Sequence, residues 1–584
     1  MLIQRMCLVL LALLPLIPAM QCARKAASSA GPTPPPTLTA LTTPSGPPTQ
    51  VAPEGAPAQI LNYDLQAEII PAKHYLKVTA QVKWEVLKPA SRLEFNLRPN
   101  LQIKSLTGPD GEALQYDRDE RGAVSVRLAK ALEPGAKPIL IMQYEGEIYG
   151  PRGGRKGQRL WDYIGKEGTY VRFESEWYPQ IPGDTATADL RITAPEDWMV
   201  VSSGRLVDVG KQSWHWRVED PAAGLSFTAA EYVLTEARAG QVPLRCYTFP
   251  QHASRAREFL DKCAEMIGFF EKLYGPYPFP KFAIAEIPDL YGGGHGDQSF
   301  IMLQEKIFRD PFDDEFVAHE LAHNWWGGQV FCTETKFPIE GFATYSQALW
   351  REHKAGAKAL RKAMQTQAEA VLLASLNAKQ EKSCFASDSG PLLYEKGAWI
   401  LHMSRELLGD EKWFRAVRRF AVANSGRDIT VAQFREALEA EYGRSLEKFF
   451  QQWLYGTGVP WVRGAVATGP KGRARVRLSQ VFVSGGGRAG SAETWKISPS
   501  NFELPVEVVI KHSGGETRKA FWLTRPSQDF DISIPGKVGG LVIDPDHWLL
   551  DHSKSLAGES DTEMENLNKE LERELGKELS DLPQ

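Results

Sequence analysis

The stretch that most constrains the fold is residues 310–328, which read DPFDDEFVAHELAHNWWGG. Pro311 suits the first turn of a helix, because proline lacks the N–H that would go unpaired there. The acidic residues that follow it lie where the helix dipole favours negative charge. Gly327 and Gly328 mark a stop. The pattern therefore predicts a helix that begins near Pro311 and ends before the two glycines.

Two histidines four residues apart, His319 and His323, lie inside this stretch. Residues four apart share a helix face, so both imidazoles can reach one metal ion at about 2.0–2.1 Å. Glu320 is one position away and can instead hold a water molecule beside the ion, where a general base belongs. Such a short motif arises by chance in about one chain in seventy of this histidine content. Histidines on a buried helix face are also more often packed than metal-bound, so further residues have to support the site.

Two later stretches supply that support. Residues 338–345, PIEGFATY, read as a second helix start, and Glu340 within them can complete a His, His, Glu set. Such a set leaves a fourth zinc position for water, as catalytic sites do. Residues 390–398, GPLLYEKGA, predict a third helix with Tyr394 in its first turns. A phenol there can donate a hydrogen bond to a developing oxyanion.

In this order, HELAHNWWG, EGFATY and YEKGAW resemble the gluzincin aminopeptidases related to aminopeptidase N and leukotriene hydrolase. The resemblance covers most of the chain after about residue 59. It implies one zinc ion, Zn2+, a peptide or protein substrate, and release of N-terminal residues. The family's metal ligands fall on His319, His323 and Glu340, its general base on Glu320, and the tyrosine that steadies the tetrahedral intermediate on Tyr394.

Two features depart from the family pattern. The spacer between the second histidine and the ligand glutamate, residues 324–339, is shorter than usual, which leaves Glu334 as a rival ligand to Glu340. The EGFA context favours Glu340. The second departure is GGGHGD at residues 292–297, where aminopeptidases of the family have GAMEN. The glutamate of GAMEN, which grips the free amine of the substrate, falls on Gly296.

The same glycine-rich segment is a candidate for substrate contact. Its glycines permit a backbone that approaches a ligand closely, and an extended peptide can pair with such an edge. The candidate substrate-binding residues are Gly293, Gly294 and Asp297; the alternative is a mobile loop. Glu174, in FESEWYP, resembles the position of a second amine-contacting residue, and an exposed strand or turn carboxylate is the alternative. We expect His295 to be an exposed loop histidine.

The 584 residues allow about three domains, and the formal net charge of −4 gives no reason to expect a nucleic acid partner. The six cysteines form no CxxC pair, which argues against cysteine zinc sites and thioredoxin-like chemistry. We expect buried free thiols at Cys246, Cys263, Cys332 and Cys384. One or two disulfides among them after export remain the alternative.

The N-terminus predicts export to the periplasm, the cell envelope or the extracellular space. Residues 1–23 read as a signal peptide, because Arg5 precedes an apolar run, Cys7–Ala19, that is shorter than the roughly 20 residues of a membrane span. Cys22 would anchor the protein to a membrane only if lipidated, and the residues before it suit lipidation poorly. Residues 24–58 are rich in Pro, Ala and Thr and predict an extended linker.

The predicted fold class is multidomain α+β. Apolar residues alternate with polar ones along 63–69 and 76–84, which is typical of strands, and 252–274 predict a long amphipathic helix. We expect an N-terminal β-domain of sandwich or saddle type at 59–245, a thermolysin-like α/β catalytic domain at 246–458, a small C-terminal β-sandwich domain at 459–555, and a charged helical or disordered tail at 556–584.

Three functions are consistent with these residues. The first is a zinc aminopeptidase in which Asp297 or Glu174 replaces the missing amine-binding glutamate. The second, suggested by Gly296, is an endopeptidase of the same fold without selectivity for a free amine. The third is a non-catalytic peptide-binding scaffold. Its expected sign is loss of a ligand, the base or the tyrosine, and each of these residues is present.

Overall fold

The computed structural model describes residues 55–149, 162–290, 293–377, 382–469, 472–484, 496–551 and 554–558. The expected signal peptide, the linker up to residue 54 and the tail beyond Gly558 lie outside these residues, as do Cys7, Cys22 and Gly292. Within the described part, every helix is too short or too polar to cross a membrane.

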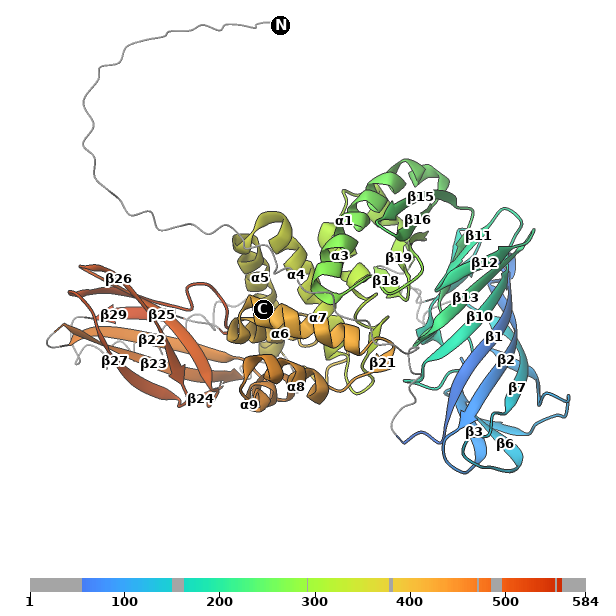
Figure 1. Cartoon of the computed structure of the whole chain (residues 1–584), viewed down its shortest axis with the longest axis horizontal. Helices are drawn as coiled ribbons and strands as arrows, with labels where there is room; N and C mark the ends of the chain where they lie inside the picture. The colour runs from blue at the N-terminus through green and yellow to red at the C-terminus, as the bar shows by residue number, and fades with distance from the viewer. Residues whose placement is uncertain are drawn as a thin grey trace, which may run out of the picture. The chain divides into compact units, whose positions relative to one another are not determined.

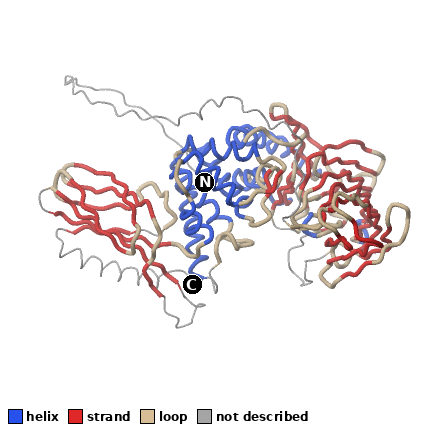
Figure 2. Tube along the Cα trace, turned by 60° about the horizontal axis from the view of Figure 1, so that its bottom comes forward, coloured by secondary structure: helices blue, strands red, loops and turns tan. Residues whose placement is uncertain are grey.

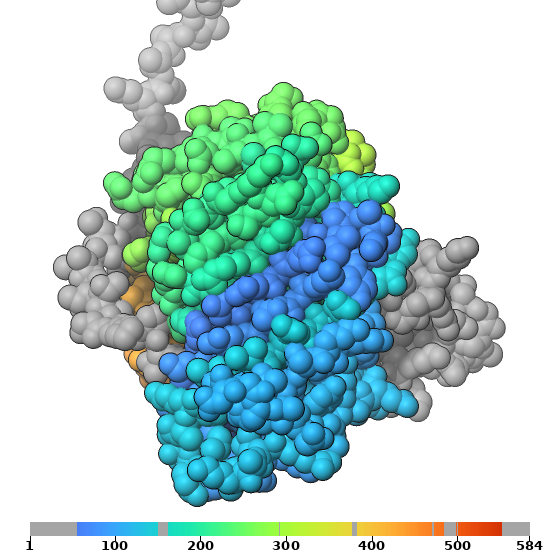
Figure 3. Space-filling model, turned by 90° about the vertical axis from the view of Figure 1, so that its right-hand side faces the viewer, coloured from blue at the N-terminus to red at the C-terminus, as the bar shows by residue number. Residues whose placement is uncertain are grey.

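The N-terminal β-domain contains three sheets. The predicted alternation is confirmed in its first strand, where Tyr63, Leu65 and Ala67 are buried and Gln66 is exposed. The largest sheet has the order β12-β13-β10-β1-β2-β7-β4, and its strands run side by side across the face shown in Figure 3. Two smaller sheets have the orders β11-β14-β9-β8 and β3-β6-β5. The strands are β1 Ala58–Ile70, β2 Tyr75–Val86, β3 Ala90–Asn96, β4 Gln102–Thr107, β5 Tyr116–Arg118, β6 Ala123–Leu132, β7 Ile139–Glu147, β8 Tyr163–Gly165, β9 Gly168–Val171, β10 Ala186–Thr193, β11 Met199–Ser202, β12 Arg205–Val209, β13 Ser213–Ala222 and β14 Phe227–Ala230.

The sheet of the expected catalytic domain includes strands from before residue 246. This five-stranded sheet has the order β15-β16-β17-β19-β18, and the expected boundary at residue 245 falls inside β16. Leu244 of β16 pairs in parallel with Phe282 of β17, so the hairpin of β15 and β16 belongs to this sheet. The sequence could not show this, because the pairing partner lies far along the chain. The strands are β15 Val233–Ala239, β16 Val242–Thr248, β17 Phe282–Ile287, β18 Gly294–Asp297 and β19 Phe300–Gln304, with β20 Val330–Phe331 and β21 Arg427–Asp428 forming a separate pair.

The helices gather in this domain, whereas strands dominate before and after it (Figure 2). The predicted helix 252–274 begins as a 3-10 turn, Pro250–Arg255, continues as α1 and ends at Gly275. The helices are α1 Ala256–Tyr274, α2 Glu305–Arg309, α3 Asp314–Ala322, α4 Phe342–Ala355, α5 Ala357–Asn377, α6 Tyr394–Leu408, α7 Asp410–Ala423, α8 Val431–Tyr442 and α9 Glu447–Phe450, with π-helical turns at Phe337–Gly341 and Gln451–Tyr455.

The C-terminal β-domain contains two sheets. The first sheet has the order β24-β23-β22-β29, and β27 pairs with the first part of β23, residues 473–479. The second sheet has the order β26-β25-β28 (Figure 1). The strands are β22 Pro460–Gly469, β23 Arg473–Ser484, β24 Lys496–Pro499, β25 Leu504–His512, β26 Gly515–Leu523, β27 Ser527–Ser533, β28 Val538–Ile543 and β29 Lys554–Gly558. Strand β29 therefore extends three residues into the expected tail.

The architecture confirms the predicted multidomain α+β fold. One apolar core fills the N-terminal domain, and a second runs without interruption from the catalytic helices into the C-terminal strands. Cys246, Cys263, Cys332 and Cys384 are buried free thiols, as expected, and burial raises the pKa of each thiol. These cysteines therefore serve as small apolar core residues.

Candidate active site

The helix of the HELAH motif begins later and ends earlier than predicted. The side chain of Asp313 accepts hydrogen bonds from the backbone N–H groups of Glu315 and Phe316, so Asp313 is the N-cap and Pro311 precedes the helix. Helix α3 ends at Ala322, and His323 forms its C-cap. The backbone of His323 is still helical, so both histidines remain on one face, with ring centroids 4.9 Å apart.

Each histidine ring is held through its Nδ1 atom. His319 Nδ1 lies 3.3 Å from Gln347 Oε1, on α4, and His323 Nδ1 lies 3.1 Å from the carbonyl oxygen of Trp326. A carbonyl oxygen only accepts, so Nδ1 of His323 carries a proton, and in the neutral imidazole Nε2 then has a free lone pair for a metal ion. Such outer contacts fix the tautomer and orientation of metal-binding histidines. No sequence pattern singles out Gln347.

Glu340 completes the set that the sequence predicted. Its Oε2 lies 3.4 Å from His319 Nε2 and 3.7 Å from His323 Nε2, and it is buried without a hydrogen-bond partner. Burial raises the pKa of Glu340, but contact with His319 and the charge of His323 outweigh this and hold the pKa at about 2. Glu334, the alternative to Glu340 as a ligand, has another partner. Its Oε1 accepts a hydrogen bond from the backbone N–H of Val431.

These three residues fit a zinc ion. One ligand atom from each lies within 4.8 Å of the others, and two nitrogens with one carboxylate oxygen form a common zinc donor set. Ligands at about 2.0–2.1 Å in a tetrahedron lie about 3.3–3.4 Å apart, close to the separations from Glu340. The orphaned buried oxygen of Glu340 also lacks the partner that an ion would supply.

Glu320 and Tyr394 line the same cleft, which has a volume of about 440 Å³. Glu320 is buried on α3, next to the two histidines. Tyr394 is the first residue of α6, three residues later than the predicted start at Pro391, and its ring is stacked 6.0 Å from that of His319. A hydrogen bond from Tyr394 also contributes to the low pKa of Glu340. The residues predicted as base and phenol therefore lie beside the candidate metal ligands.

Close backbone contact brings the second and third motifs together. A Cβ atom on Gly397 of α6 would lie 3.0 Å from Gly341 Cα, so these glycines let α6 approach the turn that carries Glu340. Buried Lys396 donates hydrogen bonds to the carbonyl oxygens of Gly456 and Gly458 and fixes the start of α6. Sequence analysis missed this role, although EGFA and EKGA each contain the glycine concerned.

The glycine-rich segment forms an edge strand, β18, against α3 (Figure 1). A Cβ atom on Gly296 would lie 2.8 Å from the carbonyl oxygen of Glu320 and from His323 Cβ. One on Gly294 would lie 2.8 Å from Phe316. The close approach of the strand to the helix backbone thus requires glycine at 296, whereas at Gly294 the contact is with side-chain atoms. Gly293 accepts a backbone hydrogen bond from Gln304, which ties it to the end of β19.

Asn324, which the sequence analysis did not single out, ties the turn between β18 and β19 to the metal-binding helix. Its side-chain oxygen accepts from the backbone N–H of Ser299, in that turn, and from the hydroxyl of Tyr277. Ser299 adopts a left-handed backbone with φ of 70°. The residue that follows the second histidine therefore helps to set the distance between the edge strand and the metal ligands.

The candidate amine-binding residues meet on the other side of β18. His295 Nε2 lies 3.5 Å from Asp297 Oδ2 and 3.8 Å from Glu174 Oε2, and all three residues line the cleft. Burial lowers the pKa of His295, but the charges of Glu174 and Asp297 outweigh this and raise it. The expectation of an exposed loop histidine is wrong, because the side chain is only 10% exposed.

Glu174 is open to the cleft, with 42% of its side chain exposed, whereas the Asp297 side chain is 6% exposed. Burial raises the pKa of Glu174, but the charges of His295 and Arg172 outweigh this and the net pKa is lowered. Glu174 is therefore an ionised carboxylate that a ligand in the cleft can reach.

Comparison with known proteins agrees with this geometry. Residues 258–453 match the peptidase family M1 domain. Aminopeptidase N of Streptomyces lividans is 24% identical over 322 residues, which cover 50% of this chain and 38% of that protein. Glutamyl aminopeptidase of Sus scrofa is 23% identical over 457 residues, covering 68% of this chain and 47% of that protein. The matched part thus spans less than half the length of these relatives.

Two solved structures share the fold. Aminopeptidase A of Legionella pneumophila, in complex with aspartic acid, has a TM-score of 0.69 at 16% identity, covering 86% of this chain and 60% of that chain. A mutant M1 zinc metallopeptidase of Deinococcus radiodurans, bound to a Tyr-Ser-Ala substrate, has a TM-score of 0.56 at 19% identity, covering 68% and 94%. The chain therefore contains a peptidase family M1 domain at residues 258–453, and its aminopeptidase N relatives support the gluzincin family of aminopeptidase N.

Proposed function

We propose that the protein is an exported zinc-dependent aminopeptidase that releases residues from the N-terminus of peptides or proteins. The observation that carries the proposal is the convergence of His319, His323 and Glu340 within 4.8 Å, beside Glu320 and Tyr394 in one cleft. Export to the periplasm, the cell envelope or the extracellular space is proposed from the short apolar run near the N-terminus.

Different residues of the cleft take different roles in peptide hydrolysis. When bound, a zinc ion supplies a Lewis acid that makes water nucleophilic near neutral pH and polarises a peptide carbonyl. The Glu320 carboxylate takes a proton from the attacking water and passes it to the leaving nitrogen. The Tyr394 hydroxyl donates a hydrogen bond to the oxyanion that develops on the carbonyl oxygen.

Selectivity for a free N-terminus is assigned to Glu174. Its carboxylate is exposed to the cleft, and its low pKa keeps it ionised, so it can bind a substrate ammonium group. Asp297 supports it from the edge strand, with His295 between the two carboxylates. The backbone of β18 remains available to pair with an extended peptide.

An endopeptidase is the second candidate, and Gly296 favours it. This glycine stands where the family pattern has the amine-binding glutamate, and the close contact with α3 leaves no room for a Cβ atom. A site without that glutamate can accept a chain that continues past the N-terminal residue.

Matched peptides with a free and an acetylated N-terminus distinguish the two. For an aminopeptidase we expect stepwise release of N-terminal residues from the free peptide alone, read by mass spectrometry. Glu174→Gln should raise KM for the free peptide, whereas the neighbouring Glu176→Gln, a carboxylate outside the cleft lining, should not. Similar cleavage of both peptides, at internal bonds, would refute the aminopeptidase assignment and support the endopeptidase.

A further inference from the structure

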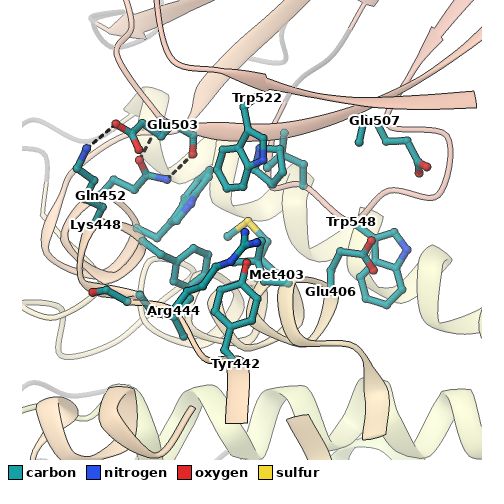
Figure 4. Close-up of a pocket in the computed structure, with 18 of the residues that line it drawn as sticks. Met403, Glu406, Tyr442, Arg444, Lys448, Gln452, Glu503, Glu507, Trp522 and Trp548 are labelled. Atoms are coloured by element: carbon teal, nitrogen blue, oxygen red, sulfur yellow. Dashed lines mark hydrogen bonds and ion pairs between the residues drawn. The ribbon is translucent and has the colours of Figure 1, made fainter. Parts of the chain in front are cut away.

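A second cavity, of about 630 Å³, lies where the last helices of the catalytic domain meet the C-terminal β-domain (Figure 4). Helix α6 contributes Met403 and Glu406, the segment from Tyr442 to Trp453 contributes a second wall, and strands β25 and β26 contribute a third. This volume is within the usual range of small-molecule sites. None of its lining residues also lines the cleft of the metal ligands.

The cavity is separated from the catalytic cleft along a single helix. Tyr394 is the first residue of α6 and Glu406 lies in its last turn, so the two positions are 12 residues apart along the helix. At about 1.5 Å per residue, the two side chains attach about 18 Å apart along the helix axis. The second cavity is therefore a different site, and its assignment does not rest on the proposed peptidase function.

Its walls offer aromatic and thioether surface. Trp522 of β26 is 51% exposed, which is unusual for tryptophan, and it lies over Met403 in Figure 4. The ring of Trp548 is stacked on buried His402 at 4.3 Å, and Met403 Sδ accepts from the backbone N–H of Leu550. The apolar surface is thus held in place before any ligand arrives, which lowers the entropy cost of binding.

Most charged groups of the lining are already satisfied. Lys448 pairs with Glu503 at 2.7 Å, and Glu507 pairs with Arg518. The carboxylate of Asp544 accepts from the backbone N–H groups of Trp548 and Leu549. These charged groups already have partners within the protein, so we do not expect them to bind a ligand.

Glu406 and Arg444 differ from them. Neither has a hydrogen-bond or ion-pair partner among the described residues, and Arg444 makes only a contact with the Tyr442 ring, 5.9 Å from its centroid. In Figure 4 Arg444 lies beside Tyr442 and Met403, whereas Glu406 lies on the side of Trp548. The carboxylate of Glu447, on the exposed first turn of α9, likewise has no partner in the part of the chain that the structure describes.

The potential around Glu406 is negative. Partial burial and, to a lesser extent, the charges of nearby carboxylates together raise the pKa of its carboxyl to about 7; these neighbours are Glu507, Asp544, Asp410 and Asp546. A cationic group placed there would relieve this repulsion. Arg444, in contrast, presents a planar guanidinium that suits a carboxylate.

We propose that this cavity binds a zwitterion with a large apolar side chain. The ammonium group contacts Glu406, the carboxylate contacts Arg444, and the side chain packs against Trp522 and Met403. A free amino acid and a short peptide share this chemistry, and the spacing of the two charges decides between them.

Isothermal titration calorimetry with three related probes tests the proposal on the full chain. L-phenylalanine carries both charges, phenethylamine only the ammonium, and 3-phenylpropanoate only the carboxylate. We expect each truncated probe to bind about tenfold more weakly, because each loses one charge-assisted contact. Titration of Phe-Phe into the Glu320→Gln protein gives the peptide arm, and tighter binding than L-phenylalanine would identify a peptide as the ligand.

Substitutions locate the binding. Trp522→Ala should weaken L-phenylalanine about tenfold or more, and Tyr149→Ala, at another side chain that is 51% exposed, should not. The Arg444→Gln protein should bind L-phenylalanine no more tightly than it binds phenethylamine. The Glu406→Gln protein should bind L-phenylalanine no more tightly than it binds 3-phenylpropanoate. Lys448→Gln, at a cation already paired, is the control for charge.

Three outcomes would overturn the proposal. One is equal affinity for phenethylamine and L-phenylalanine in the wild-type chain, which would indicate a site for organic cations. Another is L-phenylalanine binding that Trp522→Ala and Arg444→Gln both leave unchanged, which would place it in the catalytic cleft. The last is the absence of any heat at about 10 mM of every probe, well above a millimolar Kd.

Discussion

Glu320 and Glu340 are carboxylates of the same candidate metal site, and we propose different roles for them. Glu340 points its buried Oε2 at both imidazoles, whereas Glu320 lines the cleft beside them. We therefore expect Glu320→Gln to keep zinc and lose nearly all turnover, and Glu340→Gln to lose the metal. Metal analysis after dialysis, with a peptide assay on the same samples, measures both. An active Glu320→Gln protein would remove Glu320 from the role of base.

Tyr394 is predicted to act through its hydroxyl alone. Tyr394→Phe keeps the ring that is stacked on His319, so zinc content and fold should be unchanged. Loss of one oxyanion donor typically lowers kcat by about 10²–10³. Tyr455→Phe, at a phenol that is 39% exposed and outside the cleft, is the control and should leave kcat unchanged. Full activity of Tyr394→Phe would contradict the role assigned to the hydroxyl.

At the scale of elements, the contact of β18 with α3 sets the shape of the cleft. Gly296→Ala would place a Cβ atom 2.8 Å from a backbone oxygen and from His323 Cβ, and neither can move freely. We expect a loss of about 1–3 kcal/mol of unfolding free energy and weaker zinc binding. Calorimetry and competition with a zinc chelator measure the two effects.

Gly268→Ala in α1 is the matched control. A Cβ atom there meets nothing within 4 Å, and alanine in a helix interior is favoured over glycine by about 0.5–1 kcal/mol. This variant should therefore be as stable as the wild type or more stable. Equal stability of Gly296→Ala and wild type would show that the edge strand moves easily away from the helix.

The residues of the site were predictable because their chemistry is encoded locally. Spacing alone places His319 and His323 on one face. The motif context favoured Glu340 over Glu334, and the structure brings Glu340 close to both histidines while Glu334 contacts Val431. Gln347 was not predictable, because its contact with His319 depends on how α4 crosses α3. His295 was misjudged for the same reason, since glycines on either side hid a strand that pairs with β19.

The limits of helices and domains also divide into those that a local pattern encodes and those that depend on distant contacts. The limits of helix α8 are encoded locally, because Thr430 and Gln433 form a capping box and Gly443 follows its end. Helix α3 starts later than predicted, since Asp313 competed with Pro311 for the start and provides a side-chain acceptor. The domain boundary before β15 depends on a pairing across the sheet, which no local pattern contains.

At the scale of the whole molecule, the two apolar cores predict two units of stability. The catalytic helices and the C-terminal strands share one core, and the N-terminal strands have their own. Leu478 of β23 is fully buried in the first and Leu65 of β1 is 1% exposed in the second. Truncation of either leucine to alanine should cost about 2–5 kcal/mol.

The consequence for the metal site differs between the two. Although Leu478 belongs to the C-terminal domain, Leu478→Ala should lower the temperature of zinc release, because its core continues to the helices that carry the ligands. Leu65→Ala should lower a separate calorimetric transition and move zinc release much less. A third cluster, with Tyr232 and Phe300, joins the N-terminal and catalytic domains. Because of it, Leu65→Ala should lower the temperature of zinc release slightly. Equal shifts of zinc release in both variants would mean that the three domains unfold as one cooperative unit.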